Sequence, residues 1–88
     1  MTLKIETDSD GRETVIRLSG RLRSEHLDEL QTQIKSSQSP VVFDLEGVML
    51  FDVEAVRFFN TCQEKGIELL HCPPYVREWM LREQDGKN

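Results

Sequence analysis

One stretch near the middle of the chain, from Val41 to Cys62, constrains the fold more than any other. Its sequence is VVFDLEGVMLFDVEAVRFFNTC. The β-branched and aromatic residues from Val41 to Leu45 are typical of a strand that other elements cover. Glu46-Gly47 is expected to end this strand, because glycine beside a polar residue favours a turn. The stretch therefore predicts a buried strand, a short loop and the start of a helix.

Asp52 stands where that helix is expected to begin. Its carboxylate can accept a hydrogen bond from a free backbone N–H of the first turn, and its charge suits the positive end of a helix. Phe51 and Val56 flank it at the spacing of a hydrophobic staple. Gly66 is expected to end the helix. The residues that fall on its predicted buried face are Ala55, Val56, Phe58, Phe59 and Cys62.

The rest of the chain predicts three more strands and two more helices. The first two strands should form an antiparallel hairpin around a turn at 8–11, with Gly20 ending the second strand. Strands and helices then alternate, so the last three strands should be parallel and the connecting helices should cover one face. The expected segments are strands at 3–6, 14–18, 41–45 and 67–72, a helix from Ser24, which should cap it, to about residue 35, and a last helix from Pro73-Pro74.

A length of 88 residues allows one domain with a modest core. We expect this domain to span residues 1–84, with a flexible tail at 85–88. The chain has 16 acidic and 11 basic residues, a net charge of -5, which argues against nucleic acid as a partner. Neither a membrane-spanning run nor the apolar core of a signal peptide is found, so we expect a cytoplasmic protein that does not insert into membranes.

Residues with catalytic or metal-binding chemistry form no recognisable pattern. The soft ligands Cys62, Cys72, His26 and His71 match no familiar zinc spacing, and His71 and Cys72 should point to opposite faces of a strand. The serines lack a histidine partner at a recognisable spacing, and the glycines are too scattered for a phosphate loop. We therefore expect no enzymatic activity, no metal and no cofactor. The weakest alternative is a small enzyme or ligand binder that uses His71 or the acids near the loop: Asp44, Glu46, Asp52 and Glu54.

The loop and the helix start carry apolar residues that an ordinary solvated helix start does not need. Val53 shares an arc with Arg57, Asn60 and Glu64 that should face solvent. An apolar centre with a charged rim is typical of a protein-contact surface. The residues expected to bind a partner are Val48, Met49, Leu50, Asp52, Val53, Glu54 and Arg57.

Four segments, in their order along the chain, resemble one known family. They are Leu18-Ser19-Gly20-Arg21-Leu22 before a helix, Val42-Phe43-Asp44-Leu45-Glu46-Gly47-Val48, Phe51-Asp52 at the next helix start, and the stretch at 66–76. Together they resemble the STAS domain, named for sulfate transporters and anti-sigma factor antagonists. The resemblance covers nearly the whole chain. It implies an α/β, STAS-like fold with a mixed four-stranded sheet, parallel β-α-β units and helices mainly on one face.

The resemblance also implies a non-enzymatic, protein-binding function. In the bacterial antagonists the strand–loop–helix site binds an anti-sigma factor that is also a serine kinase. The kinase switches the antagonist off by phosphorylating a serine or threonine that follows the helix-opening Asp. This chain reads Asp52-Val53-Glu54-Ala55, so Glu54 stands at the usual phosphoacceptor position and no phosphorylation is expected there.

Three interpretations of Glu54 stay open. It can act as a fixed imitation of phosphoserine, the chain can belong to a branch that binds without phosphorylation, or Glu54 can be a first-turn acid paired with Arg57. The functional expectation is a regulatory module of the anti-sigma factor antagonist kind. The alternative is a constitutive STAS-type subunit of a larger assembly, such as an ABC-type lipid transport complex. A homodimer is compatible with either function.

Overall fold

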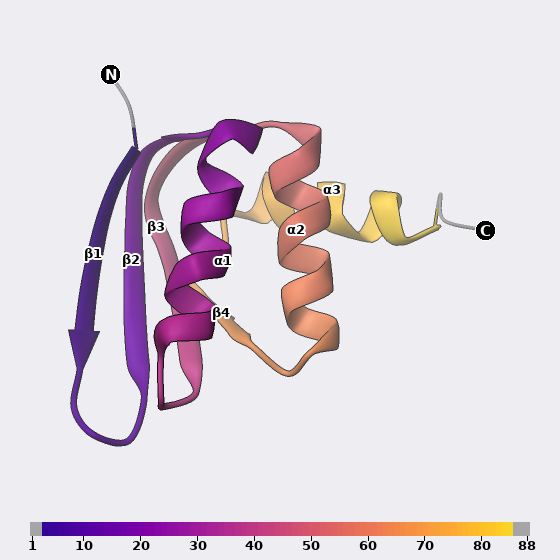
Figure 1. Ribbon diagram of the computed structural model, residues 1–88. Helices are drawn as coiled ribbons and strands as arrows, with labels where there is room; N and C mark the ends of the chain where they lie inside the picture. The colour runs from indigo at the N-terminus through magenta and orange to yellow at the C-terminus, as the bar shows by residue number, and fades with distance from the viewer. Residues whose placement is uncertain (1–2, 86–88) are drawn as a thin grey trace.

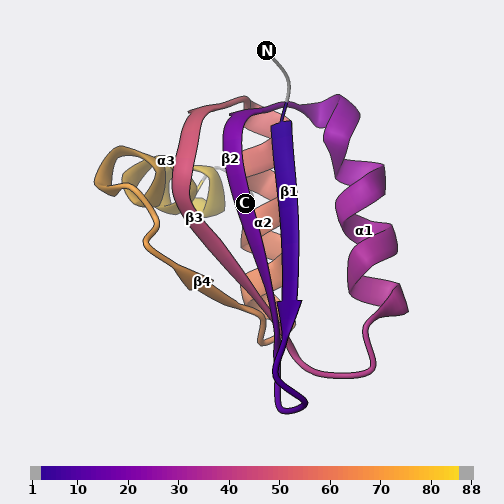
Figure 2. The same cartoon turned by 90° about the vertical axis from the view of Figure 1, so that its left-hand side faces the viewer.

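The computed structural model describes residues 3–85, and in it the strands form one sheet with the helices on one side (Figure 1). The view from the sheet side places β1 and β2 in front and α2 behind them (Figure 2). The expected α/β fold with a mixed four-stranded sheet is therefore confirmed. The elements are β1 (Leu3–Ser9), β2 (Thr14–Leu22), the 3₁₀-helix η1 (Ser24–His26), α1 (Leu27–Ser36), β3 (Val41–Phe51), α2 (Val53–Glu64), β4 (Glu68–Leu70) and α3 (Pro74–Asp85).

The sheet has the order β1-β2-β3-β4, and it contains both antiparallel and parallel strand pairs, as expected. β1 pairs antiparallel with β2 around a turn in which Gly11 has a φ of 88°. The pairs β2–β3 and β3–β4 are both parallel. α3 extends to Asp85, while the rest of the expected tail lies outside the described residues, so the tail stays a prediction.

β2 and β3 are both longer than the sequence predicts, and the expected ends at Gly20 and Glu46-Gly47 are wrong. Two register shifts explain the difference. Arg17 pairs with Asp44 but Ser19 pairs with Gly47, and a second shift follows Gly20, whose φ is 101°. Such shifts let a strand continue to pair after the regular alternation of its side chains between the two faces of the sheet is interrupted. Residues 46–50 therefore belong to β3 and do not form the expected loop.

The start of the first helical segment also differs from the prediction. Ser24 is not a side-chain cap; instead its backbone N–H donates to Asp52 Oδ2 at 2.8 Å. The backbone N–H of Arg23 donates to His26 Nδ1 at 3.1 Å, so His26 closes this turn. A contact 28 residues away in sequence thus does what a local cap was expected to do. The predicted apolar stripe of α1 is confirmed, with Leu30 buried and Leu27 and Ile34 packed against the core.

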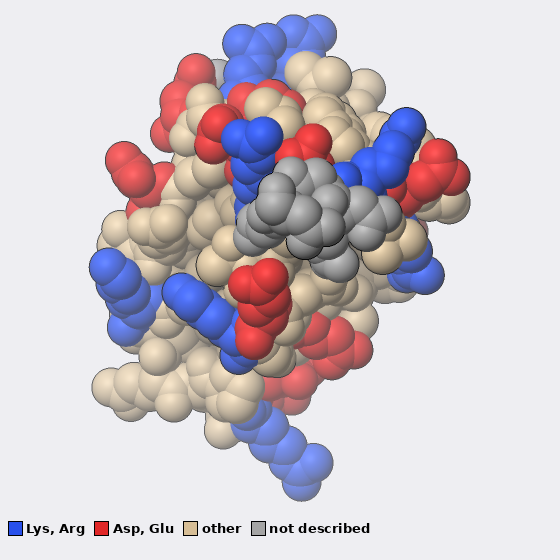
Figure 3. Space-filling view, turned by 90° about the vertical axis from the view of Figure 1, so that its right-hand side faces the viewer, with Lys and Arg blue, Asp and Glu red and all other residues tan. Residues whose placement is uncertain are grey.

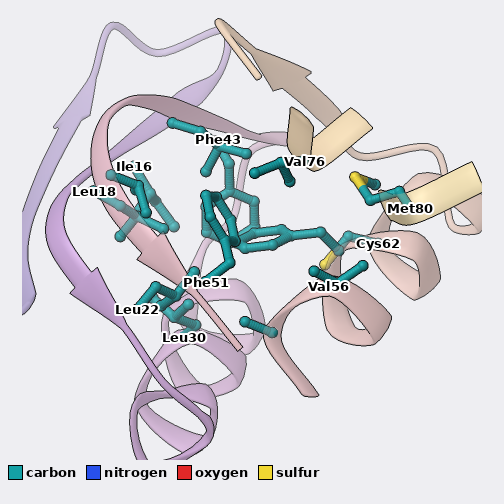
Figure 4. Packing of buried hydrophobic residues seen from close by; sticks show 14 of the residues in the cluster. Ile16, Leu18, Leu22, Leu30, Phe43, Phe51, Val56, Cys62, Val76 and Met80 are labelled. Carbon is teal, nitrogen blue, oxygen red and sulfur yellow. The ribbon is translucent and has the colours of Figure 1, made fainter. Parts of the chain in front are cut away.

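The core lies between the sheet and the helices (Figure 4). Phe43, Phe51 and Phe59 are buried in it, and the partly buried Phe58 packs against them. Phe59 is fully buried, and its ring meets those of Phe43, Phe51 and Phe58 edge to face, with ring centroids 5.3, 6.1 and 5.2 Å away. Cys62 is the small core residue that its spacing predicts, and burial raises the pKa of its thiol to about 11. The predicted buried face of α2 is thus confirmed, with Phe58 only partly buried.

Asn60 is buried, contrary to the expectation that it faces solvent. Its Nδ2 donates to the backbone oxygen of Met80 at 3.0 Å. The amide is thereby satisfied inside the protein, where an unpaired polar group would be costly. The prediction failed because α3 packs against this side of α2, a fact that the helical periodicity of α2 alone does not contain.

Candidate functional site

The carboxyl ends of β2 and β3 meet the starts of η1 and α2 at one edge of the sheet (Figure 1). Parallel strands direct their carboxyl ends to the same edge, and sites in such folds are usually built there. This edge contains the strand–helix junction at Asp52. This edge is therefore the candidate functional surface.

Asp52 caps α2, as the sequence predicts. Its Oδ1 accepts the backbone N–H of Ala55 at 2.9 Å, and its Oδ2 accepts the backbone N–H of Ser24 at 2.8 Å. The flanking residues Phe51 and Val56 both belong to the buried core, as expected for a hydrophobic staple. One half-buried carboxylate therefore joins the starts of two helical segments and fixes the geometry of this edge.

Asp52→Ala is expected to lower the free energy of unfolding by about 2 kcal/mol. A lost N-cap costs about 1 kcal/mol, and the backbone N–H of Ser24 loses its partner as well. Denaturant unfolding measures this loss. Ser24→Ala is the matched control and should change stability by less than about 0.5 kcal/mol, because Ser24 contributes its backbone rather than its hydroxyl. Equal losses in the two variants would contradict this assignment.

The predicted contact residues divide into exposed and buried ones. Met49 is 78% exposed and Leu50 is 44% exposed, both near the end of β3. Val53 is half-buried rather than exposed. Val48 is only 6% exposed and lies in the core, so its expected place on an exposed loop is wrong. The reason is the register of β3, which pairs Val48 with Gly20 inside the sheet.

The charged residues of the helix start form a short ion-pair chain. Arg57 Nη1 lies 3.6 Å from Glu54 Oε2, the pairing expected for a first-turn acid, and Arg57 Nε lies 2.9 Å from Glu83 Oε1 on α3. The hydrogen bond to Glu83 and the charge of that carboxylate raise the pKa of Arg57. The helix side of the molecule shows positive and negative side chains interspersed (Figure 3). Among the described residues visible on this face, no charge of one sign dominates.

A second polar group, which the sequence analysis did not bring together, lies at the end of β4. His71 Nδ1 is 3.0 Å from Asp44 Oδ1, and Arg17 Nε is 3.7 Å from Asp44 Oδ2. Burial raises the pKa of Asp44, but the backbone N–H of Glu46 together with His71 and Arg17 lowers it overall. The hydrogen bond that the His71 ring makes to the Asp44 carboxylate, together with the negative charge of that carboxylate, raises the pKa of His71.

The signal that could have found this pair is the parallel order of β3 and β4. Asp44 pairs in register with Leu70, so the residue after β4 falls beside Asp44. His71 has a φ of 57°, a left-handed conformation that is uncommon for residues other than glycine. This conformation ends β4 earlier than predicted. The expectation that His71 and Cys72 alternate on a strand is therefore wrong.

The overall fold matches solved structures of known kind. An antisigma-factor antagonist STAS domain from Rhodobacter sphaeroides matches with a TM-score of 0.59 and 16% sequence identity, over 78% of this chain and 86% of that one. A structure described as Mglu matches with a TM-score of 0.62 and 17% identity, over 78% of this chain and 19% of that one. No family model and no curated protein matches the sequence.

These similarities define the class of structure. The chain has the fold of a STAS domain, and the resemblance expected from its four segments is confirmed at the level of the fold. Within residues 3–85 no helix has the length and apolar character needed to cross a lipid bilayer.

Proposed function

We propose that this chain is a non-enzymatic, protein-binding regulatory module of the anti-sigma factor antagonist kind, acting in the cytoplasm of a bacterium. The observation that carries the proposal is the pair of exposed apolar residues, Met49 and Leu50, at the strand–helix edge of a STAS fold. The partner that fits best is an anti-sigma factor.

Met49 and Leu50 are presented on a fixed backbone. Leu50 pairs in register with Arg21 of β2, and the next residue, Phe51, is anchored in the core. Association orders the groups at an interface, and a surface held in place beforehand loses less entropy. The ion pair of Glu54 and Arg57 lies in the first two turns of α2, at the position of a charged rim. These features support the binding site expected at 49–57, without the buried Val48.

Glu54 supports binding without a phosphorylation switch at this position. It has no hydroxyl group, and it lies in the first turn of α2, where a negative charge is favourable. A constitutive subunit of a larger assembly remains the second candidate, because a permanent partner needs no such switch. Purification of the tagged protein from its source cells distinguishes the two: a transport complex at fixed stoichiometry favours the subunit, and a separable anti-sigma factor favours the regulator.

Met49→Asp is expected to weaken binding to the cognate anti-sigma factor by roughly 100-fold or more, because charge at the centre of an apolar contact must be desolvated. Its stability should change by less than about 0.5 kcal/mol, since the side chain is exposed. Isothermal titration calorimetry measures the affinity. Val53→Asp is a poorer probe, because Val53 is half-buried and its replacement would also destabilise the fold.

Leu81→Asp is the matched control for this experiment. Leu81 is an exposed apolar residue, 56% accessible, but it lies on α3 rather than at the strand–helix edge. Its replacement should leave binding unchanged. An equal loss of affinity in Leu81→Asp, or full affinity in Met49→Asp, would place the partner elsewhere and overturn the proposed site.

Glu54→Ser tests the role of the acid at the phosphoacceptor position. If Glu54 imitates a phosphorylated, non-binding state, serine should raise the affinity for the anti-sigma factor. If Glu54 contacts the partner itself, serine should lower the affinity. The same variant, incubated with ATP and an anti-sigma factor that has kinase activity, should accept phosphate at residue 54, which mass spectrometry would detect.

A further inference from the structure

The polar group beside β4 contains three side chains with metal-binding atoms. Asp44, Glu46 and His71 each offer one ligand atom, and these atoms all lie within 4.8 Å of one another. The group does not include Met49 or Leu50: it combines Asp44 and Glu46, at the first register shift of β3, with His71, the residue that follows β4. Its chemistry is not used by the proposed protein-binding function.

The donor set indicates which ion would fit. Two carboxylates and one imidazole combine hard oxygen donors with a nitrogen donor of intermediate softness. Imidazole suits zinc and neighbouring transition metals, whereas calcium and magnesium prefer oxygen donors alone. Bonds of about 2.0 to 2.2 Å around zinc place tetrahedral donor atoms roughly 3.3 Å apart. Asp44 Oδ1 and His71 Nδ1, at 3.0 Å, are already near that separation.

The three ligands differ in how firmly they are held. Asp44 is largely buried, and its Oδ1 also accepts the backbone N–H of Glu46 at 3.1 Å, which orients the carboxylate. Hydrogen bonds of this kind hold metal ligands in place. Arg17 approaches the other oxygen, Oδ2, so it does not stand between Asp44 Oδ1 and His71. Glu46 is exposed, and a change of side-chain rotamer can close the remaining distance.

We propose that Asp44, Glu46 and His71 form a binding site for one zinc-like divalent transition-metal ion, with a fourth position left for water. The ion takes the place of the proton that His71 Nδ1 and Asp44 Oδ1 share. It joins the end of β4 to the middle of β3, two strands that pair over only three residues. The site has no sequence motif, because strand pairing brings its ligands together from distant parts of the chain.

The test titrates zinc chloride into the full-length, isotope-labelled protein after EDTA treatment and dialysis. We expect one equivalent of zinc to bind, with the NMR signals of Asp44, Glu46 and the His71 ring shifting together. Millimolar magnesium should neither cause these shifts nor prevent them. An absence of zinc binding, or the same shifts with magnesium, would overturn the proposal.

Variants assign the ligands. His71→Ala and Glu46→Gln should each lower the affinity for zinc about tenfold or more, and both change exposed side chains, so the fold should persist. Cys72→Ser and His26→Ala are the controls, because they remove the neighbouring thiol and the other histidine. Undiminished affinity in both ligand variants, or loss of binding in Cys72→Ser, would contradict the assigned site.

Discussion

Phe59→Ala is expected to lower the free energy of unfolding by about 4 kcal/mol, the typical cost of removing a fully buried aromatic ring. Phe59 is fully buried, and three phenylalanine rings meet its ring edge to face. A domain of this length has a total stability of roughly 4 to 13 kcal/mol. The variant should therefore lose roughly a third or more of the total stability, and urea unfolding followed by circular dichroism measures the loss.

Phe58→Ala is the matched control for this prediction. Phe58 is the same residue type on the same helix, but it is only partly buried and meets two phenylalanine rings, those of Phe43 and Phe59. Its removal leaves a smaller cavity, so about half the loss is expected. A larger loss in Phe58→Ala than in Phe59→Ala would show that the centre of the core lies elsewhere.

Gly47→Ala is expected to destabilise the fold by roughly 2 to 3 kcal/mol, at the upper end of the usual cost of overpacking. A Cβ atom at Gly47 would lie 2.6 Å from Ser19 Cβ and 3.2 Å from the backbone oxygen of Leu18. The two strands are paired at this point, so neither backbone can move without disturbing the sheet. Equilibrium denaturation of the single variant measures the cost.

A second substitution tests the cause of that cost. Ser19→Gly removes the nearest atom, so the double variant should recover part of the loss, and the coupling between the two sites should exceed about 0.5 kcal/mol. Gly11→Ala serves as the control. A Cβ atom there meets nothing within 4 Å, and only its φ of 88° is unfavourable, so we expect a smaller loss that Ser19→Gly does not rescue. Additive effects of Gly47→Ala and Ser19→Gly would contradict a direct clash.

The corrected course of β3 changes the interpretation of the candidate site. A flexible loop at residues 46–50 would order its backbone on binding a partner. The structure instead pairs this segment with β2 and leaves Met49 and Leu50 exposed on a fixed strand. The candidate surface is therefore smaller than the sequence predicts, because Val48 is buried in the core. It is also more rigid, because its backbone is paired in the sheet.

The sequence by itself determined the number, type and order of the main elements. Each followed from a local cause: the apolar run from Val41 to Leu45, the helical spacing of the α2 core residues, and the cap at Asp52. Gly11 and Gly66 mark turns because each has a positive φ, which glycine adopts without strain. Such signals depend on residues a few positions apart, so they can be recognised from the sequence without the tertiary structure.

The tertiary structure alone decided the features that depend on distant partners. The register shifts of β3 extend the strand through Glu46-Gly47, and the packing of α3 buries Asn60. Asp52 satisfies the backbone of Ser24 from 28 residues away, and β4 brings His71 to Asp44 from 27 residues away. The periodicity of apolar residues describes one helix or strand at a time. Which side chains are buried, and which come together as metal ligands, depends on how the helices and strands pack against one another. For that reason the exposure of Met49, Leu50, Glu54 and Arg57 was predictable, whereas the burial of Val48 and the contact between His71 and Asp44 were not.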